Sequence, residues 1–253
     1  MGWIGREIGH FFVGLMFLTR LPVPPGIEHH NGRLARSARY FPLIGVIIGL
    51  ISGIVFFGAS QFMPATLAAA LALAASLIVT GGLHEDGLAD CCDGLGATRD
   101  RDRAMEIMRD SRLGTYGALG LFMSLALRVI ALSTFTPIQG MIALVVCHAV
   151  SRSVMPPVLV SGEYARTHGL ASGVAQGVSY VEAGFAVLIS LLIAFTAGFG
   201  AGLTAFAAAF VAGGLMLIIL IRRLGGYTGD GLGAIQQLAE IAVLITLVGF
   251  WVQ

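Results

Sequence analysis

Residues 41–63 read FPLIGVIIGLISGIVFFGASQFM, and this stretch decides what kind of fold the chain adopts. It contains no charged residue and is long enough to cross a bilayer, which takes about 20 apolar residues in a helix. Its small residues recur at close spacing in GVIIGLISG, a pattern typical of membrane helices that approach one another closely. The stretch therefore predicts a transmembrane helix packed against others.

The composition of the whole chain agrees with a membrane protein. Of 253 residues, 57% are hydrophobic and 11% are charged, whereas soluble domains carry about 25% charged residues. The net charge of +1 gives no strong field, so nothing indicates a nucleic-acid partner. Further runs of spanning length lie at 65–83, 116–134, 138–160, 183–200, 202–221 and 232–252. They predict a single all-α domain over residues 1–253, a polytopic helical bundle with about seven spans.

The N-terminal apolar run at 11–18 is too short to span. Arg20 and LPVPP follow it without a small-residue cleavage site, so we expect mature protein here, as an interfacial or re-entrant helix. Arginine placement orients the spans. The uncharged links lie near 64, 135–137 and 201, and the arginine-bearing connections at 22–40, 84–115, 161–182 and 222–231. The latter connections are therefore expected on the cytoplasmic side.

An acidic cluster, LHEDGLADCCDG at 83–94, interrupts the apolar chain. If it is helical, Asp86, Asp90 and Asp93 share a stripe roughly 60° wide, with Glu85 nearby. Clustered carboxylates repel one another and stay together only around positive charge. Oxygen ligands without matching His or Cys partners suit a hard cation, Mg²⁺ or Mn²⁺.

Arg109, Arg112 and Tyr116 follow this cluster just before a span. Arginine forks bind phosphate oxygens in a bidentate manner. Arginines beside a metal site indicate phosphoryl transfer, in which positioning and charge neutralisation carry most of the catalysis. The chain has no GxxxxGK[ST] loop, which excludes a P-loop nucleotide hydrolase.

Polar residues near or inside the later spans are further candidates. Glu240 lies within a span, where a carboxylate is costly and indicates function. Asp230 is either a functional carboxylate or the N-cap of that span. His148 and Arg152 share a helix face and form either an interhelical pair or a ligand site. Arg128 is expected to snorkel from the outer end of its span.

Four runs carry a family resemblance: FLTRLPVP, GGLHEDGLADCCDGLG, MRDSRLGTYGALGL and GGYTGDGLGA. They resemble cobalamin synthase, the adenosylcobinamide-GDP ribazoletransferase of bacteria. The resemblance implies a multi-pass inner-membrane enzyme that uses Mg²⁺. It also implies that adenosylcobinamide-GDP is joined to α-ribazole, or its 5′-phosphate, with release of GMP. The product would be adenosylcobalamin or its 5′-phosphate.

Together, the residues and the resemblance predict roles on the cytoplasmic side. Asp86, Asp90 and Asp93 would hold Mg²⁺. Either Glu85 or Asp230 would accept the proton of the attacking hydroxyl. The residues expected to bind substrate or phosphate are Arg20, Arg109, Arg112, Tyr116 and Arg152. The partners are the two small substrates and the lipid bilayer, and a homo-oligomer is left open.

Two other functions remain to be weighed. A CDP-alcohol phosphotransferase would carry DxxDGxxAR and a second aspartate pair. Asp90, Asp93 and Gly94 fit the first part, but Arg99 stands one place late and the second pair is missing. A divalent-cation transporter would use the acidic cluster as an ion port. The site of such a transporter is expected near the bilayer midplane, between inverted repeats. Here the acidic cluster lies at the cytoplasmic edge of the spans, and the sequence shows no repeat.

Overall fold

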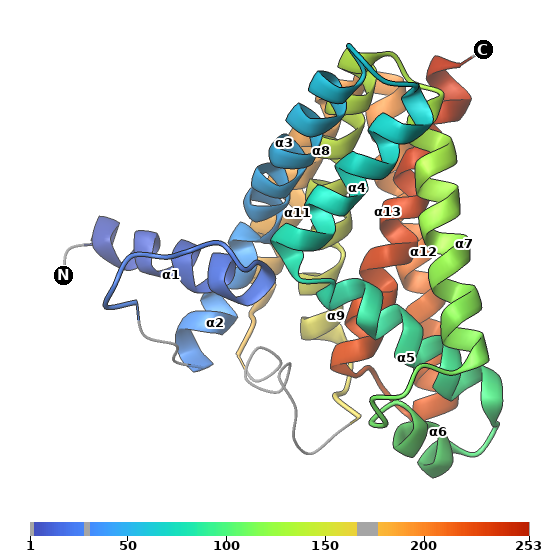
Figure 1. The fold of residues 1–253 in the computed structure, drawn as a ribbon. Coiled ribbons are helices and arrows are strands. Elements are labelled where there is room, and N and C mark those ends of the chain that lie inside the picture. Colours follow the sequence, from blue (N-terminus) through green and yellow to red (C-terminus); the bar gives the residue numbers. More distant parts are fainter. Residues whose placement is uncertain (1–2, 28–30, 166–176, 253) are drawn as a thin grey trace.

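The computed structural model describes residues 3–27, 31–165 and 177–252, and helices make up most of this part (Figure 1). The predicted all-α bundle is confirmed. In chain order the helices are α1 (Trp3–Leu18), α2 (Asn31–Ser37), η1 (Ala38–Tyr40), α3 (Phe41–Ala59), α4 (Ala65–Thr80), α5 (Leu83–Ala97), α6 (Arg101–Ile107), α7 (Thr115–Ser133), α8 (Pro137–Ser153), α9 (Met155–Ser161), α11 (Tyr180–Ala194), η2 (Phe195–Ala197), α12 (Phe199–Leu224) and α13 (Gly229–Trp251).

The number of spans agrees with the prediction. Six helices of the described chain are long and apolar enough to cross a membrane, or up to seven if the bent pair α4 and α5 counts as one span. The predicted run at 138–160 divides into α8 and α9 near Val154. Pro156 and Pro157 follow this break, and proline lacks the N–H that an unbroken helix would need there.

α1 lies beside the bundle and across its long direction (Figure 1). Its 16 residues are too few for a span, and Trp3, Ile4 and Ile8 on it are exposed. This placement is compatible with the expected interfacial helix. Its position relative to lipid stays a prediction.

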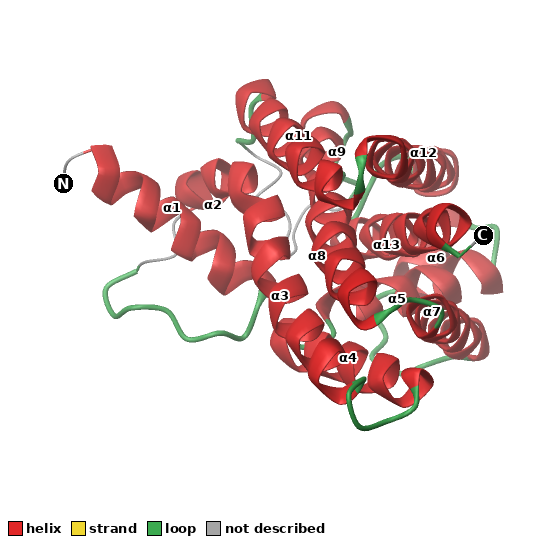
Figure 2. Cartoon of the chain, turned by 90° about the horizontal axis from the view of Figure 1, so that it is seen from above, coloured by secondary structure: helices red, strands yellow, loops and turns green. Residues whose placement is uncertain are grey.

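α8 and α13 form the interior of the bundle. In the apolar window of each span, 83% is buried for Pro137–Ser161, which consists mainly of α8, and 67% for α13, against 28% for both α7 and α12. Seen from above, α8 and α13 lie among the other long helices (Figure 2). The outer helices therefore present apolar side chains outward, as a bundle in lipid requires, and the inner two can carry polar groups.

Glycines bring α3 directly against α8. A Cβ added at Gly49 would lie 2.5 Å from the Cα of Val145, and one at Gly45 would meet the carbonyl of His148. The obstructing atoms are backbone, so side chains cannot relieve the clash. The small residues that predicted close approach therefore form a real helix contact here.

The connections with arginines gather at one end of the bundle. α2, α6 and the α12–α13 connection lie at the lower end in Figure 1, and the α3–α4 and α7–α8 turns lie at the upper end. This arrangement is the one that the arginine pattern predicts.

The α3–α8 contact can be tested with one matched pair of variants. We expect Gly49→Ala to lower the unfolding temperature in detergent, because overpacking typically costs about 1–3 kcal/mol. Gly58→Ala, on the same helix with nothing within 4 Å of the new Cβ, should leave it unchanged. Thermal unfolding followed by size-exclusion chromatography measures both. Equal unfolding temperatures for the two variants would contradict the contact.

Candidate functional site

The acidic stretch lies on a helix that turns sharply away from the preceding span. α4 ends at Thr80, and α5 begins at Leu83 at an angle of 93° to it. Gly81 and Gly82 make the turn with φ of 70° and 69°, in the left-handed region that favours glycine. The acidic stretch is helical, as the stripe argument supposed, and the turn directs this helix across the end of the bundle.

A pocket of about 900 Å³ opens beside α5 and collects residues from three parts of the chain. α5 contributes Glu85, Asp86 and Asp90. The segment after α1 contributes Arg20, and the α6–α7 connection contributes Arg109 and Arg112. Apolar side chains complete the wall: Met16, Phe17, Leu83, Met108, Leu113 and Leu121. Carboxylates and guanidiniums that lie far apart in the sequence thus share one pocket.

Arg112 is held by a neighbouring carboxylate at the edge of this pocket. Its Nε lies 3.0 Å from both oxygens of Asp110, and its Nη2 lies 2.5 Å from Oδ2. These hydrogen bonds lower the pKa of Asp110 to about 2. The two side chains therefore stay ionised at neutral pH, and the exposed pair is ready to exchange partners at little energetic cost.

Asp93 has a different environment from Asp86 and Asp90. It is buried, and its two oxygens accept from the backbone N–H groups of Gly114 and Gly117, each at 2.8 Å. These amides belong to the N-terminal turn of α7, where a carboxylate is favourable. Asp93 does not line the pocket, and its contacts make it an anchor between α5 and α7.

The other predicted residues lie outside the pocket lining. Tyr116 is exposed, with its ring next to Gly96. Arg152 is buried in the core. The backbone of Asp230 lies against Gly87 of α5, where an added Cβ would be 2.7 Å from the Asp230 oxygen.

The N-cap of α13 is not Asp230, which was one of the two interpretations of this residue from the sequence. Thr228 is the N-cap, because its hydroxyl accepts from the N–H of Gly231 at 2.9 Å. The expectation that Asp230 caps this helix is therefore wrong, and Asp230 falls in the first turn.

A buried ion-pair network lies behind the pocket. Nη1 of Arg128 is 3.0 Å from an oxygen of Glu85 and 3.0 Å from an oxygen of Glu240. The Arg128 and Glu240 side chains are each 1% exposed, and that of Glu85 is 12% exposed. The expected snorkelling of Arg128 is wrong, because two carboxylates hold its head inside the bundle. Breaking such a buried pair typically costs about 3–5 kcal/mol.

Amides extend the network along α13. Gln237 donates to the same Glu85 oxygen at 3.0 Å, and Gln236 donates to Glu240 at 2.7 Å and to Ser151 at 2.8 Å. Neither glutamine is among the site residues expected from the sequence. The available signal was two adjacent amides inside an apolar span, one turn before Glu240.

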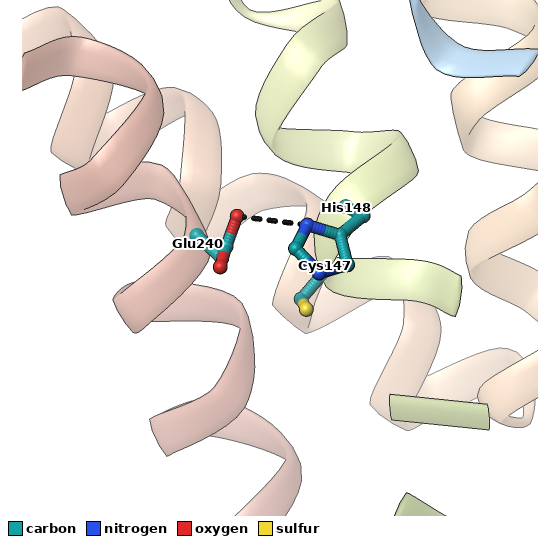
Figure 3. Close-up of side chains that lie close together, drawn as sticks. All are labelled: Cys147, His148 and Glu240. Carbon is teal, nitrogen blue, oxygen red and sulfur yellow. Dashed lines mark ion pairs between the residues drawn. The ribbon is translucent and has the colours of Figure 1, made fainter. Parts of the chain in front are cut away.

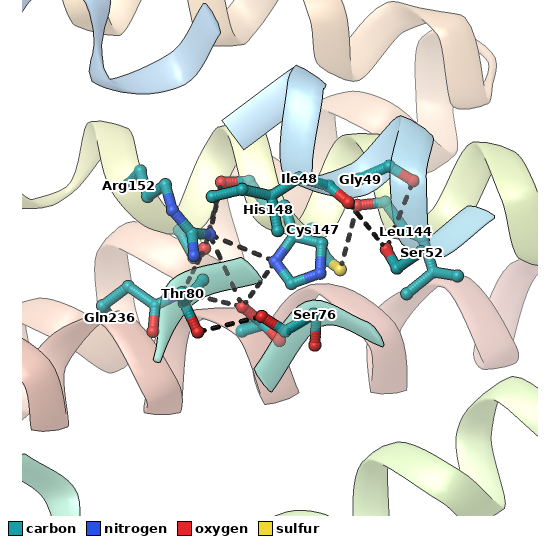
Figure 4. A network of polar contacts seen from close by, with 12 residues as sticks. Ile48, Gly49, Ser52, Ser76, Thr80, Leu144, Cys147, His148, Arg152 and Gln236 are labelled. Carbon is teal, nitrogen blue, oxygen red and sulfur yellow. Dashed lines mark hydrogen bonds and ion pairs between the residues drawn. The ribbon is translucent and has the colours of Figure 1, made fainter. Parts of the chain in front are cut away.

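His148 and Arg152 join the network from α8 (Figure 4). Nδ1 of His148 lies 3.1 Å from Glu240, and Nη1 of Arg152 lies 3.1 Å from that same nitrogen. The interhelical interpretation of the His148–Arg152 pair is thus confirmed.

Cys147, His148 and Glu240 offer ligand atoms within 4.8 Å of one another (Figure 3). Two guanidiniums already face the Glu240 carboxylate, those of Arg128 at 3.0 Å and Arg152 at 3.8 Å. A metal ion there would add positive charge beside both. We therefore interpret the group as part of the ion-pair network.

The family model for cobalamin-5-phosphate synthase matches residues 10–248. A protein from Leptothrix cholodnii named adenosylcobinamide-GDP ribazoletransferase is 43% identical, over 97% of each chain. A protein of the same name from Shewanella amazonensis is 38% identical, over 100% of both chains. Another from Shewanella baltica is 36% identical, over 96% of this chain and 94% of the relative. No solved structure matches this chain significantly.

The family match covers the helices that build the pocket and those that carry the buried network, and the relatives align over nearly the whole chain. This chain belongs to the cobalamin-5-phosphate synthase family.

Proposed function

We propose that this chain is an adenosylcobinamide-GDP ribazoletransferase, which joins adenosylcobinamide-GDP to α-ribazole or its 5′-phosphate and releases GMP. The names of its relatives support this activity. The observation that carries the chemistry is the pocket, in which Asp86 and Asp90 lie with Arg20, Arg109 and Arg112. A diphosphate ester needs both kinds of group, cations for its oxygens and carboxylates for a metal and a proton.

The pocket fits Mg²⁺ as the cofactor. The metal-binding side chains among its lining residues, within the described chain, are carboxylates, without His or Cys, and Mg²⁺ prefers oxygen ligands. Asp86 and Asp90 would hold the ion. Asp93, assigned to the metal from its helical register, has both oxygens engaged by amides, so we give it the role of holding α5 against α7. Bound Mg²⁺ would supply charge neutralisation at the diphosphate.

The chain's own residues divide the remaining work. A ribazole ribose hydroxyl attacks the cobinamide-linked phosphorus, a new P–O bond forms, and the bond from that phosphorus to the bridging oxygen breaks, so GMP leaves with that oxygen. Arg109 and Arg112 bind phosphate oxygens, and Arg20 lies in the same pocket. Glu85 accepts the hydroxyl proton. Glu85 is preferred to Asp230 because it lines the pocket, whereas Asp230 does not.

The apolar part of the pocket wall suits the bulky and partly apolar cobinamide. We place the enzyme in the bacterial inner membrane with this pocket on the cytoplasmic side. The arginine-rich connections at the same end of the bundle support this orientation (Figure 1).

The comparisons support neither rival function. The family match is to cobalamin-5-phosphate synthase over most of the chain, which disfavours a phospholipid-forming phosphotransferase. Glu240, a carboxylate deep inside a span, is paired with Arg128, which disfavours an open cation path.

The proposed activity predicts a specific product. Purified protein supplied with adenosylcobinamide-GDP, α-ribazole and Mg²⁺ should release GMP, and Asp90→Asn should lower the rate by about 100-fold or more. The variant should still elute as folded protein in detergent. Chromatography of released nucleotides measures the product. CMP release from a CDP-alcohol in place of GMP release would reject the assignment, and full activity of Asp90→Asn would reject the site.

The separate roles of Asp86 and Asp93 predict opposite responses. Asp86→Asn should raise the Mg²⁺ concentration for half-maximal rate about tenfold or more, because it removes a charged ligand. Asp93→Asn should leave that concentration within about twofold and lower the unfolding temperature, because it weakens a cap worth about 1 kcal/mol. Magnesium titrations and thermal unfolding of both variants measure this. A large Mg²⁺ shift in Asp93→Asn would return Asp93 to the metal site.

A further inference from the structure

Of the side chains that form the buried network, only Glu85 also lines the pocket. The network joins four helices: α5 through Glu85, α7 through Arg128, α8 through His148 and α13 through Glu240. A network that served packing alone would have no need to end on a group exposed to substrate.

Within the described chain, the hydrogen bonds to Glu85 fall on one oxygen. Oε1 accepts from Nη1 of Arg128 and from Nε2 of Gln237, each at 3.0 Å. Oε2 has no donor there. The carboxylate of a residue that lines the pocket is therefore fixed through one oxygen, and the other remains for a reacting group.

The donors are themselves fixed. Nη1 of Arg128 also donates to Glu240 at 3.0 Å, and Gln237 also donates to Gln236 at 2.9 Å. Ser124 donates to the Gln237 oxygen at 3.2 Å, and the nitrogen of that amide faces Glu85, because an ionised carboxylate only accepts hydrogen bonds. A chain of satisfied hydrogen bonds is more rigid than a single pair.

Backbone contacts bring these groups within reach of each other. An added Cβ at Gly233 of α13 would lie 3.0 Å from the His84 oxygen and 3.2 Å from the Gly87 Cα, both on α5. The two helices touch through glycine at this point. Gln237 stands four residues after Gly233, on the same face of α13, which places its amide beside Glu85.

We propose that Arg128 and Gln237 are positioning residues of the transferase, which act by holding Glu85 so that Oε2 faces the attacking hydroxyl. This inference rests on the proposed function. Neither residue lines the pocket, so each acts on the reaction through Glu85. Loss of either should therefore lower kcat and leave KM for adenosylcobinamide-GDP within about threefold.

A double-mutant cycle tests this dependence. Glu85→Gln should lower kcat about 100-fold, because it removes the proton acceptor, and Arg128→Met should lower it about 10- to 100-fold. The double variant should fall no more than about threefold below Glu85→Gln. If the kcat losses of the two single variants multiplied in the double variant, the proposal would be overturned, since Arg128 would then act independently of Glu85.

Arg152→Met is the matched control, because Arg152 is also a buried arginine of the network but contacts His148 and Glu240 and not Glu85. Whatever fold-loss in kcat Arg152→Met causes alone, that loss should multiply with the loss caused by Glu85→Gln. A cycle for Arg152 as non-additive as the one for Arg128 would show a general structural effect and reject the positioning role.

Gln237→Met is the second variant, and it keeps the test decisive if Arg128→Met does not fold. It removes one hydrogen bond to Glu85 without leaving a buried charge. We expect its kcat to fall about 3- to 30-fold, with the same non-additivity and with folded protein in detergent. An unchanged kcat for a folded Gln237→Met protein would also overturn the proposal. Absence of GMP release by the unmodified protein, seen before any variant is compared, would instead reject the proposed function.

Discussion

A charge inside a membrane-spanning bundle persists only where an opposite charge meets it, and Arg128 is where this chain satisfies that constraint. Its guanidinium joins Glu85 of α5 to Glu240 of α13 through two contacts of 3.0 Å. Any rotation of α5 or shift of α13 would leave a buried charge unpaired, at a cost of several kcal/mol. The contacts of Arg128 with Glu85 and Glu240 therefore fix the position of α5 on the bundle, and with it the shape of the pocket.

α5 is anchored at two points with different chemistry. Glu85 is tied to the charged interior, and Asp93 is tied to the backbone amides that begin α7. Asp86 and Asp90 lie between these anchors and line the pocket. A row of acidic residues that looks uniform in the sequence thus divides into residues held by other helices, Glu85 and Asp93, and residues that line the pocket, Asp86 and Asp90, with Glu85 belonging to both groups. The two glycines of the α4–α5 turn make the division possible, because they direct the helix across the end of the bundle.

The sequence predicts the architecture well because hydrophobic length and arginine placement are local signals. The helix supposed over the acidic stretch is present as α5, and Arg20, Arg109 and Arg112, expected to bind phosphate, line the pocket beside it. Prediction from the sequence fails where the outcome depends on which helices touch. Register puts Asp93 on one face with Asp86 and Asp90, and only the position of α7 shows that the backbone N–H groups of Gly114 and Gly117 donate to its carboxylate. Arg128 looked like a snorkelling residue because its partners are distant in the sequence, on α5 and α13.

The charges of the two regions also support a cation in the proposed reaction. The network balances Arg128 and Arg152 against Glu85 and Glu240, so it imposes little net field on the pocket. The pocket balances Arg20, Arg109 and Arg112 against the aspartates Asp86, Asp90 and Asp110. A diphosphate that enters a balanced pocket brings negative charge that the pocket's own side chains do not compensate. A divalent cation bound with it would restore the balance, and α5 carries carboxylate oxygens of the kind that such a cation prefers.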